Sequence, residues 1–157
     1  MNRRITLKLN GEPRVVEVEP GDLLLDVLRE KLGVKSPKIG CERGDCGACT
    51  VLLDGKSVRS CLILAIEADG QDITTVEGLA GTALSPVQRS FLERGAFQCG
   101  FCAPGIVLAA TELLKKNPRP SEAEIKEAIA GNLCRCTGYQ GIIAAIAAVG
   151  QKAGRSA

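Results

Sequence analysis

Eight cysteines in a chain without histidine constrain this sequence more than any other feature. They fall into two sets of four, one in each half of the chain. Because histidine is absent, a histidine-based catalytic triad, histidine-bound zinc and a Rieske-type cluster are excluded. In a reducing cytosol, eight cysteines at such tight spacings favour metal binding over disulfides.

The first set has the spacing C-x4-C-x2-C-x11-C and consists of Cys41, Cys46, Cys49 and Cys61. Its first intervals are those of a plant-type [2Fe-2S] cluster. A loop that folds around inorganic sulfide with its amide groups inward needs residues that lack a Cβ and that accept positive φ. The residues that meet this need are Gly40, Gly44 and Gly47. The sequence therefore predicts a [2Fe-2S] cluster in this loop, with the three glycines as its cradle.

The second set has the spacing C-x2-C-x31-C-x1-C and consists of Cys99, Cys102, Cys134 and Cys136. Each pair lies in a break between predicted helices, so packing these helices together would bring four thiolates to one place. A C-x-C pair is unusual for structural zinc, and disulfides are rare in a reducing cytosol. We therefore favour a second [2Fe-2S] cluster. A zinc-stabilised interaction module, a purely structural second tetrad and mutual disulfides are the alternatives.

The composition argues against nucleic acid and membranes as partners. Three Phe, one Tyr and no Trp leave few rings to stack on bases, and a formal net charge of +2 gives no basic surface. The apolar stretch over residues 141–149 is too short for a bilayer, which takes about 20 apolar residues in a helix. The alternating N-terminal residues do not form a signal peptide. We expect a cytoplasmic protein that neither binds nucleic acid nor inserts into a membrane.

The N-terminal half has the patterns of a small sheet. Alternating polar and apolar residues flank Asn10-Gly11, and a second such segment flanks Asp54-Gly55; both predict β-hairpins. Apolar residues at helical spacing predict a helix over residues 22–32 with Asp22 as its N-cap. A last strand is expected over residues 72–76. Strands and one helix without βαβ alternation predict an α+β domain.

From residue 85 onward the apolar period is helical. Ser85 with Gln88 and Ser121 with Glu124 form capping boxes that predict the starts of two helices. Two further apolar stripes bring the predicted number to four. The chain is therefore divided into a sheet domain over residues 1–76, a linker over 77–84 and a helical domain over 85–157.

These motifs resemble those of the small iron–sulfur subunits of the molybdenum hydroxylases, the xanthine dehydrogenase, aldehyde oxidoreductase and carbon monoxide dehydrogenase family. The matching segments, in order, are residues 40–50, 60–61, 98–105 and 131–139. The resemblance covers nearly the whole chain. It implies a plant-type ferredoxin-like β-grasp domain that carries the first cluster, followed by a four-helix domain that carries the second.

The resemblance also implies partners and an electron path. It implies a large subunit with a molybdopterin cofactor and, commonly, a medium subunit with FAD. Gln98, through its side-chain amide, and Cys136, through its ligating sulfur, would touch the pterin. Electrons would then pass from molybdenum through the second cluster to the first, and on to FAD or another acceptor. Electron transfer in such a complex is the first hypothesis; a free-standing two-cluster ferredoxin-like carrier or redox sensor is the second.

Overall fold

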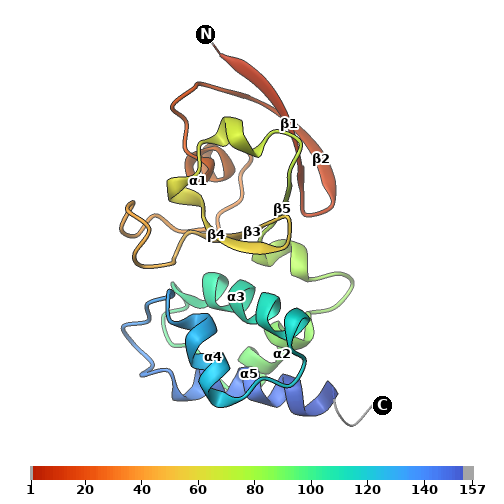
Figure 1. Ribbon diagram of the computed structural model, residues 1–157, viewed down its shortest axis with the longest axis vertical. Helices are drawn as coiled ribbons and strands as arrows, with labels where there is room; N and C mark the ends of the chain where they lie inside the picture. The colour runs from red at the N-terminus through yellow and green to blue at the C-terminus, as the bar shows by residue number, and fades with distance from the viewer. Residues whose placement is uncertain (1, 154–157) are drawn as a thin grey trace.

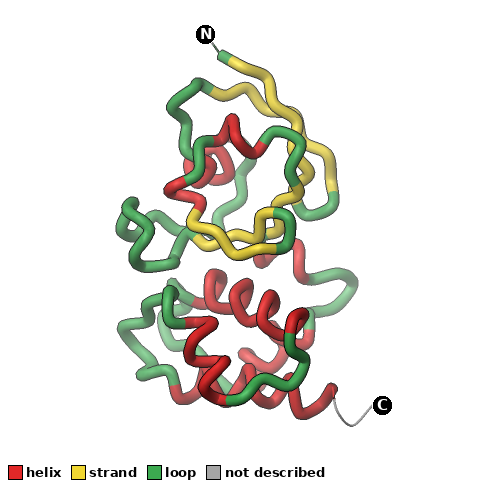
Figure 2. The backbone as a smooth tube through the Cα atoms, viewed as in Figure 1, coloured by secondary structure: helices red, strands yellow, loops and turns green. Residues whose placement is uncertain are grey.

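The computed structural model describes residues 2–153, so residues 1 and 154–157 of the predicted domains lie outside its described part. Two halves stack along the long axis of the molecule, with the strands in the N-terminal half and the longer helices in the C-terminal half (Figures 1 and 2). The predicted α+β class is confirmed. No helix within the described range is long and apolar enough to cross a membrane.

A five-stranded mixed sheet forms the frame of the N-terminal half. The strands lie in the order β2-β1-β5-β3-β4, and only the β1–β5 pair is parallel. Both predicted hairpins are present, with positive φ at Asn10, Gly11, Asp54 and Gly55 as type I′ turns require. The strands are β1 (Arg3–Leu9), β2 (Glu12–Val18), β3 (Thr50–Leu53), β4 (Lys56–Arg59) and β5 (Asp72–Thr74).

The helix expected over residues 22–32 begins later than predicted and changes its winding. It consists of α1 (Leu24–Asp26), continued by the π-helical turn η1 (Val27–Lys31). Asp22 is not its N-cap, so this prediction was wrong. The Asp22 carboxylate instead accepts hydrogen bonds from the Glu19 backbone N–H and from Lys31 Nζ, which ties the segment before the helix to its end.

The strand expected over residues 72–76 ends at Thr74, because the chain then turns into the 3₁₀ helix η4 (Val76–Leu79). Two further 3₁₀ helices, η2 (Ser60–Leu62) and η3 (Ala65–Ala68), lie between β4 and β5. The η4 turn begins at the last residue of the predicted sheet domain and continues into the segment predicted as a linker. Its Val76 and Leu79 side chains pack against the core of the helical half.

Four helices form the C-terminal half: α2 (Pro86–Glu93), α3 (Ala103–Lys116), α4 (Glu122–Ile129) and α5 (Gln140–Ala153). Both predicted capping boxes are present: the Ser85 hydroxyl accepts from the Gln88 N–H at the start of α2, and the Ser121 hydroxyl accepts from the Glu124 N–H at the start of α4. Buried apolar side chains of all four helices form one core, and the sheet half has a separate core. Helix α3 joins the two halves, because it packs against β3 and β4 (Figure 1).

Candidate metal centres

The cysteines of the first set come together from two segments. Cys41, Cys46 and Cys49 lie in the loop before β3, and Cys61 lies in η2. Their thiols form two contacting pairs, Cys41 with Cys46 and Cys49 with Cys61. The first pair is partly exposed and the second is buried. Two pairs of thiols match the two iron ions of one [2Fe-2S] cluster, each of which takes two protein ligands.

Backbone N–H groups of the loop point at these thiols. The Cys46 N–H lies 3.3 Å from Cys41 Sγ, and the Ala48 N–H lies 3.5 Å from Cys46 Sγ. Hydrogen bonds from the backbone of Arg43 and Cys46 lower the pKa of Cys41 to about 6. Burial, with a contribution from Cys49, raises the pKa of Cys61 to about 11. The loop thus supplies the hydrogen-bond donors that a sulfur-rich anionic centre needs. The buried Cys61 thiol needs a nearby cation to ionise.

The three predicted cradle glycines meet different neighbours. A Cβ on Gly40 would lie 2.8 Å from Cys46 Sγ, so Gly40 leaves space beside the thiols. Gly44 has a φ of +87° and lies under the Leu62 side chain. Gly47 has a φ of +74°, but its open side faces Gly131 and Asn132 of the helical half. Its lack of a side chain therefore serves the contact between the two halves.

The cysteines of the second set meet where the loop before α3 faces the loop between α4 and α5. Cys99 contacts Cys136, with the Sγ atoms 3.5 Å apart, and Cys102 contacts Cys134. Cys99 and Cys136 are exposed, whereas Cys102 is buried at the start of α3. Burial raises the pKa of Cys102 to about 12, so this thiol too needs a cation to ionise. Gln98, next to Cys99, is exposed.

The arrangement in pairs differs from the single tetrahedron of ligands that a structural zinc ion needs. Within residues 2–153, no three Cys, Asp or Glu side chains surround one point closely enough for a lone ion. A binuclear centre has its ligands spread around two metal positions, so the paired thiols fit a [2Fe-2S] cluster in each half.

Tyr139 orders the second cysteine loop. Its Oη accepts a hydrogen bond from the Cys134 N–H at 2.8 Å and donates one to the Asn132 carbonyl at 3.1 Å. The Thr137 hydroxyl lies 3.1 Å from Cys134 Sγ. Tyr139 itself has a φ of +68°, a conformation that is rare for a residue with a side chain. The phenol thus holds the backbone on both sides of Leu133.

A polar network joins the two loops, and sequence reasoning did not find it. Asn132, which is 2% exposed, donates from Nδ2 to the Gly47 carbonyl at 3.0 Å and to Thr50 Oγ1 at 3.1 Å. Arg59 donates to Thr50 Oγ1 at 2.8 Å and to the Gly131 carbonyl at 2.6 Å. The available signal was position: Arg59 lies two residues before Cys61, and Asn132 two before Cys134.

Comparison with known proteins agrees with this geometry in both halves. Residues 7–83 match the family model of a 2Fe-2S iron–sulfur cluster binding domain, and residues 75–147 match that of a [2Fe-2S] binding domain. The chain is 51% identical to the nicotine 6-hydroxylase small subunit of Paenarthrobacter nicotinovorans over 142 residues, which cover 90% of this chain and 86% of the relative. It is 50% identical to the xanthine dehydrogenase iron–sulfur-binding subunit of Escherichia coli O157:H7, with 88% and 89% covered.

Solved structures show the same fold. A chain of quinoline 2-oxidoreductase from Pseudomonas putida 86 superposes with a TM-score of 0.93 and is 51% identical, with 98% of this chain and 97% of that chain covered. The two matched cluster-binding domains agree with the paired thiols found in each half of this chain. The chain therefore belongs to the iron–sulfur small subunits of the molybdenum hydroxylases; it carries two [2Fe-2S] clusters and transfers electrons within a multi-subunit oxidoreductase.

Proposed function

We propose that this chain conducts electrons from a molybdopterin cofactor on a large partner subunit towards an FAD-binding subunit or another acceptor. In this proposal the first cluster is held by Cys41, Cys46, Cys49 and Cys61, and the second by Cys99, Cys102, Cys134 and Cys136. Each contacting pair of thiols holds one iron ion. The chain supplies ligands, hydrogen bonds and a fixed separation, while the substrate chemistry takes place on the partner.

We assign residues 1–76 to a plant-type ferredoxin-like β-grasp domain, 77–84 to a linker and 85–157 to a four-helix domain. The two separate cores support this division. The order of the five strands around α1 and η1 supports the β-grasp assignment. Because η4 packs on the helical core, we expect the linker to hold the two domains in one orientation.

The observation that carries the proposal is the unequal exposure of the second set of thiols. Cys99 and Cys136 are exposed beside the exposed Gln98, whereas Cys102 is buried. An exposed thiolate pair brings its iron to the surface, where a cofactor on another subunit can approach it. We therefore assign Gln98 and Cys136 to the contact with the pterin, with the Gln98 amide as hydrogen-bonding group and the Cys136 sulfur as the electron entry point.

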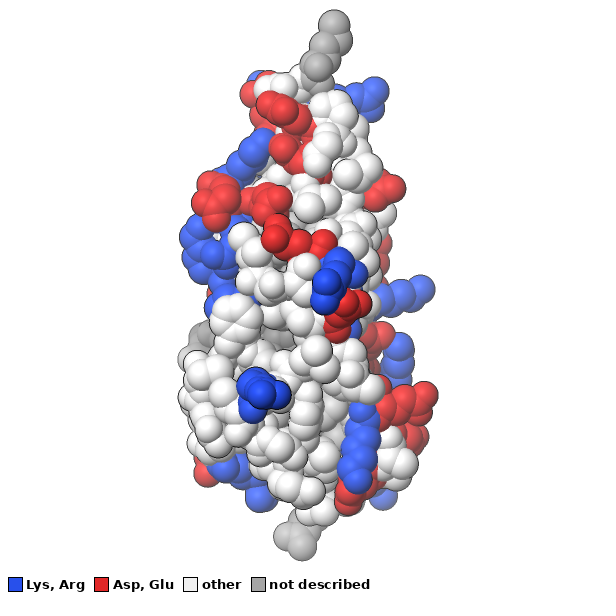
Figure 3. Space-filling view, turned by 90° about the vertical axis from the view of Figure 1, so that its left-hand side faces the viewer, with Lys and Arg blue, Asp and Glu red and all other residues white. Residues whose placement is uncertain are grey.

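Apolar side chains surround both sets of cysteines at the surface. Large exposed apolar residues lie within two residues of a ligand in the sequence: Ile39, Leu62, Phe101 and Leu133, which are 45–59% exposed. The loop before β3 and the loop between α4 and α5 lie on the same side of the molecule (Figure 1), and much of the lower half of that side is uncharged (Figure 3). Exposed apolar patches of this kind mark protein interfaces, which favours a permanent partner over a free-standing carrier.

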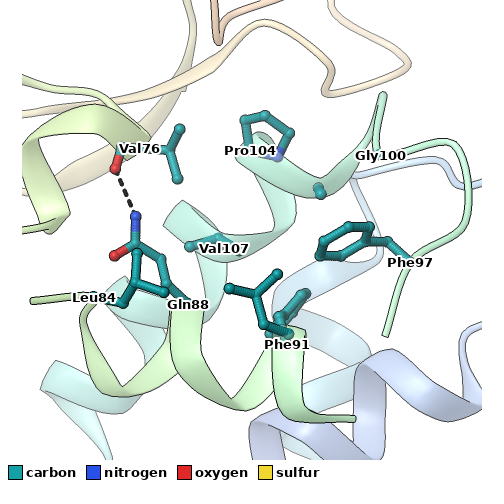
Figure 4. A pocket seen from close by; sticks show the side chains of 10 residues that line it. Val76, Leu84, Gln88, Phe91, Phe97, Gly100, Pro104 and Val107 are labelled. Carbon is teal, nitrogen blue, oxygen red and sulfur yellow. Dashed lines mark hydrogen bonds between the residues drawn. The ribbon is translucent and has the colours of Figure 1, made fainter. Parts of the chain in front are cut away.

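An apolar cleft lies beside Gly100. It has a volume of about 270 Å³ and is walled by α2, the start of α3 and the 97–100 loop (Figure 4). Leu84 and Leu92 line it and are 42% and 57% exposed. Because the cleft adjoins the Gln98-Cys99 segment, we assign it to an apolar side chain of the large subunit.

Leu92→Glu is expected to weaken assembly of the complex, because Leu92 lines the cleft assigned to the partner. The variant should keep its iron, because Leu92 is not a ligand and lies seven residues before Cys99. A carboxylate buried at the interface without a partner costs at least about 3 kcal/mol, or more than about hundredfold in affinity. Gel filtration with molybdenum and iron analysis should show the wild-type chain in a large molybdenum-containing assembly and the variant as a small, iron-loaded species.

Val15→Glu is the matched control. Val15 is an exposed apolar residue of β2, away from both cysteine loops, and its replacement should leave the assembly intact. Unchanged assembly of the Leu92 variant would contradict the assigned contact surface. A wild-type chain that purifies from its native cells as a small iron-only species would instead favour the free-standing carrier or sensor.

A further inference from the structure

One hydrogen bond connects the backbone of a first-set cysteine to the residue before a second-set cysteine. The Leu133 N–H donates to the Cys46 carbonyl at 2.9 Å, and Leu133 directly precedes Cys134. We propose that this Leu133–Cys46 hydrogen bond is the electronic bridge between the two clusters. The inference rests on the ligand assignment proposed above.

The bridge joins a ligand of each cluster by covalent bonds and a single hydrogen bond. From Cys46 Sγ it runs along that residue to its carbonyl, crosses the hydrogen bond, and continues through Leu133 to Cys134 Sγ. Electronic coupling falls less steeply along covalent and hydrogen bonds than across a van der Waals gap. The loop before α3 also approaches the first cysteine loop, where Phe101 Cε1 lies 3.9 Å from the position of a Cβ on Gly40. This is a van der Waals contact, and among residues 2–153 no hydrogen bond joins Phe101 to Gly40.

The bridge is clamped on both sides. Asn132, adjacent to Leu133, donates to the carbonyl of Gly47, adjacent to Cys46. Arg59 holds the Gly131 carbonyl from the sheet half, and the Tyr139 hydroxyl holds the Asn132 carbonyl from the helical half. Asn132 is buried and its Nδ2 makes two hydrogen bonds, so it is a positioning residue: it sets the register in which the Leu133 N–H meets the Cys46 carbonyl.

The bridge and the proposed contact with the partner lie on different ligand pairs of the second cluster. Cys134 contacts the buried Cys102, whereas the exposed pair, Cys99 and Cys136, faces the proposed partner. The bridge therefore leaves from the pair of ligands farther from the partner. One electron crosses it at a time: the donor cluster is oxidised by one electron, the acceptor cluster is reduced by one, and no proton or covalent bond is exchanged.

Leu133→Pro tests the bridge, because proline has no N–H. The Leu133 side chain is 59% exposed on the apolar surface assigned to the partner, so Leu133→Ala, which shortens the same side chain but keeps the N–H, is the matched control for any effect on assembly. Both variants are studied in the assembled complex. The measurements are inter-cluster electron transfer after rapid one-electron reduction, and exchange splitting in the paramagnetic resonance of the fully reduced complex. We expect transfer several-fold slower and a reduced splitting in the proline variant, with full iron content, and wild-type values in the alanine variant.

Asn132→Asp provides a second test if the proline variant does not bind its iron. It replaces the amide donor with a carboxylate that faces the Gly47 carbonyl, so it should displace Leu133 and slow transfer in the same direction. Reduction potentials of both clusters, measured in each variant, separate a changed driving force from lost coupling.

Wild-type transfer and splitting in an iron-loaded Leu133→Pro complex would overturn the bridge. So would slowing by Phe101→Leu alone, which would assign the route to the surface contact. Neither result would affect the proposed function, which is tested by the two clusters of the wild-type chain and by its assembly with a molybdenum-containing partner.

Discussion

Cys102→Ala is expected to remove the second cluster from the complex and to abolish electron flow from the molybdenum site to the acceptor. Cys102 is buried at the start of α3 and contacts Cys134, so its loss leaves one iron position with a single thiolate in a site that water cannot easily fill. Iron content should fall from about four to about two ions per chain. The paramagnetic signal of the first cluster should remain.

Cys49→Ala is the reciprocal variant, because Cys49 is one of the two buried members of the first set and directly precedes β3. It should remove the other signal and keep the second cluster. Retention of both signals and of all iron in either variant would show that the ligands are assigned wrongly. The two variants together also determine which signal belongs to which half.

Gly47→Ala is expected to destabilise the protein by about 2–5 kcal/mol and to separate the two halves. The φ of +74° costs a residue with a side chain about 1–2 kcal/mol. In addition, the new Cβ would lie within 3.0 Å of the Gly131 carbonyl and of two atoms of Asn132, and overpacking of this kind costs about 1–3 kcal/mol. The expected readouts are a lower melting temperature of the iron-loaded chain and faster loss of both clusters on heating.

Gly55→Ala separates the two contributions. Gly55 has a φ of +80° in the β3–β4 turn, and a Cβ there would meet nothing within 4 Å. This variant should lose only the backbone contribution, about 1–2 kcal/mol. Equal destabilisation by the two alanine substitutions would mean that the contact between Gly47 and the helical half does not stabilise the protein.

Local signals in the sequence predict local structure well. Asn10-Gly11 and Asp54-Gly55 determine their hairpins because positive φ at both turn positions admits few residue types. Ser85 and Ser121 determine helix starts through hydrogen bonds within one turn. Asp22 has a side chain of the capping type, yet its carboxylate accepts a hydrogen bond from Lys31 Nζ at the far end of the helical segment. Patterns for helix starts do not include such a distant partner.

The candidate sites show the same difference between local features, which the sequence predicts, and long-range contacts, which it does not. Cysteine spacing predicts the first tetrad because three of its ligands lie close together in one loop, and it predicts the second from two close pairs, C-x2-C and C-x-C, that lie in breaks between helices. The spacing does not reveal that Cys99 and Cys136 are exposed while Cys102 is buried, because this depends on how four helices pack. The Asn132 contact with Gly47 joins residues 85 positions apart, and it exists only once the two halves have docked.

Low-temperature paramagnetic resonance of the dithionite-reduced complex tests most directly that two [2Fe-2S] clusters, one in each half of the chain, form the electron path. Two such clusters should give two distinct signals from half-integer spins, each integrating to one spin per chain, alongside about four iron ions. A single signal, or none, from a fully loaded complex would contradict it.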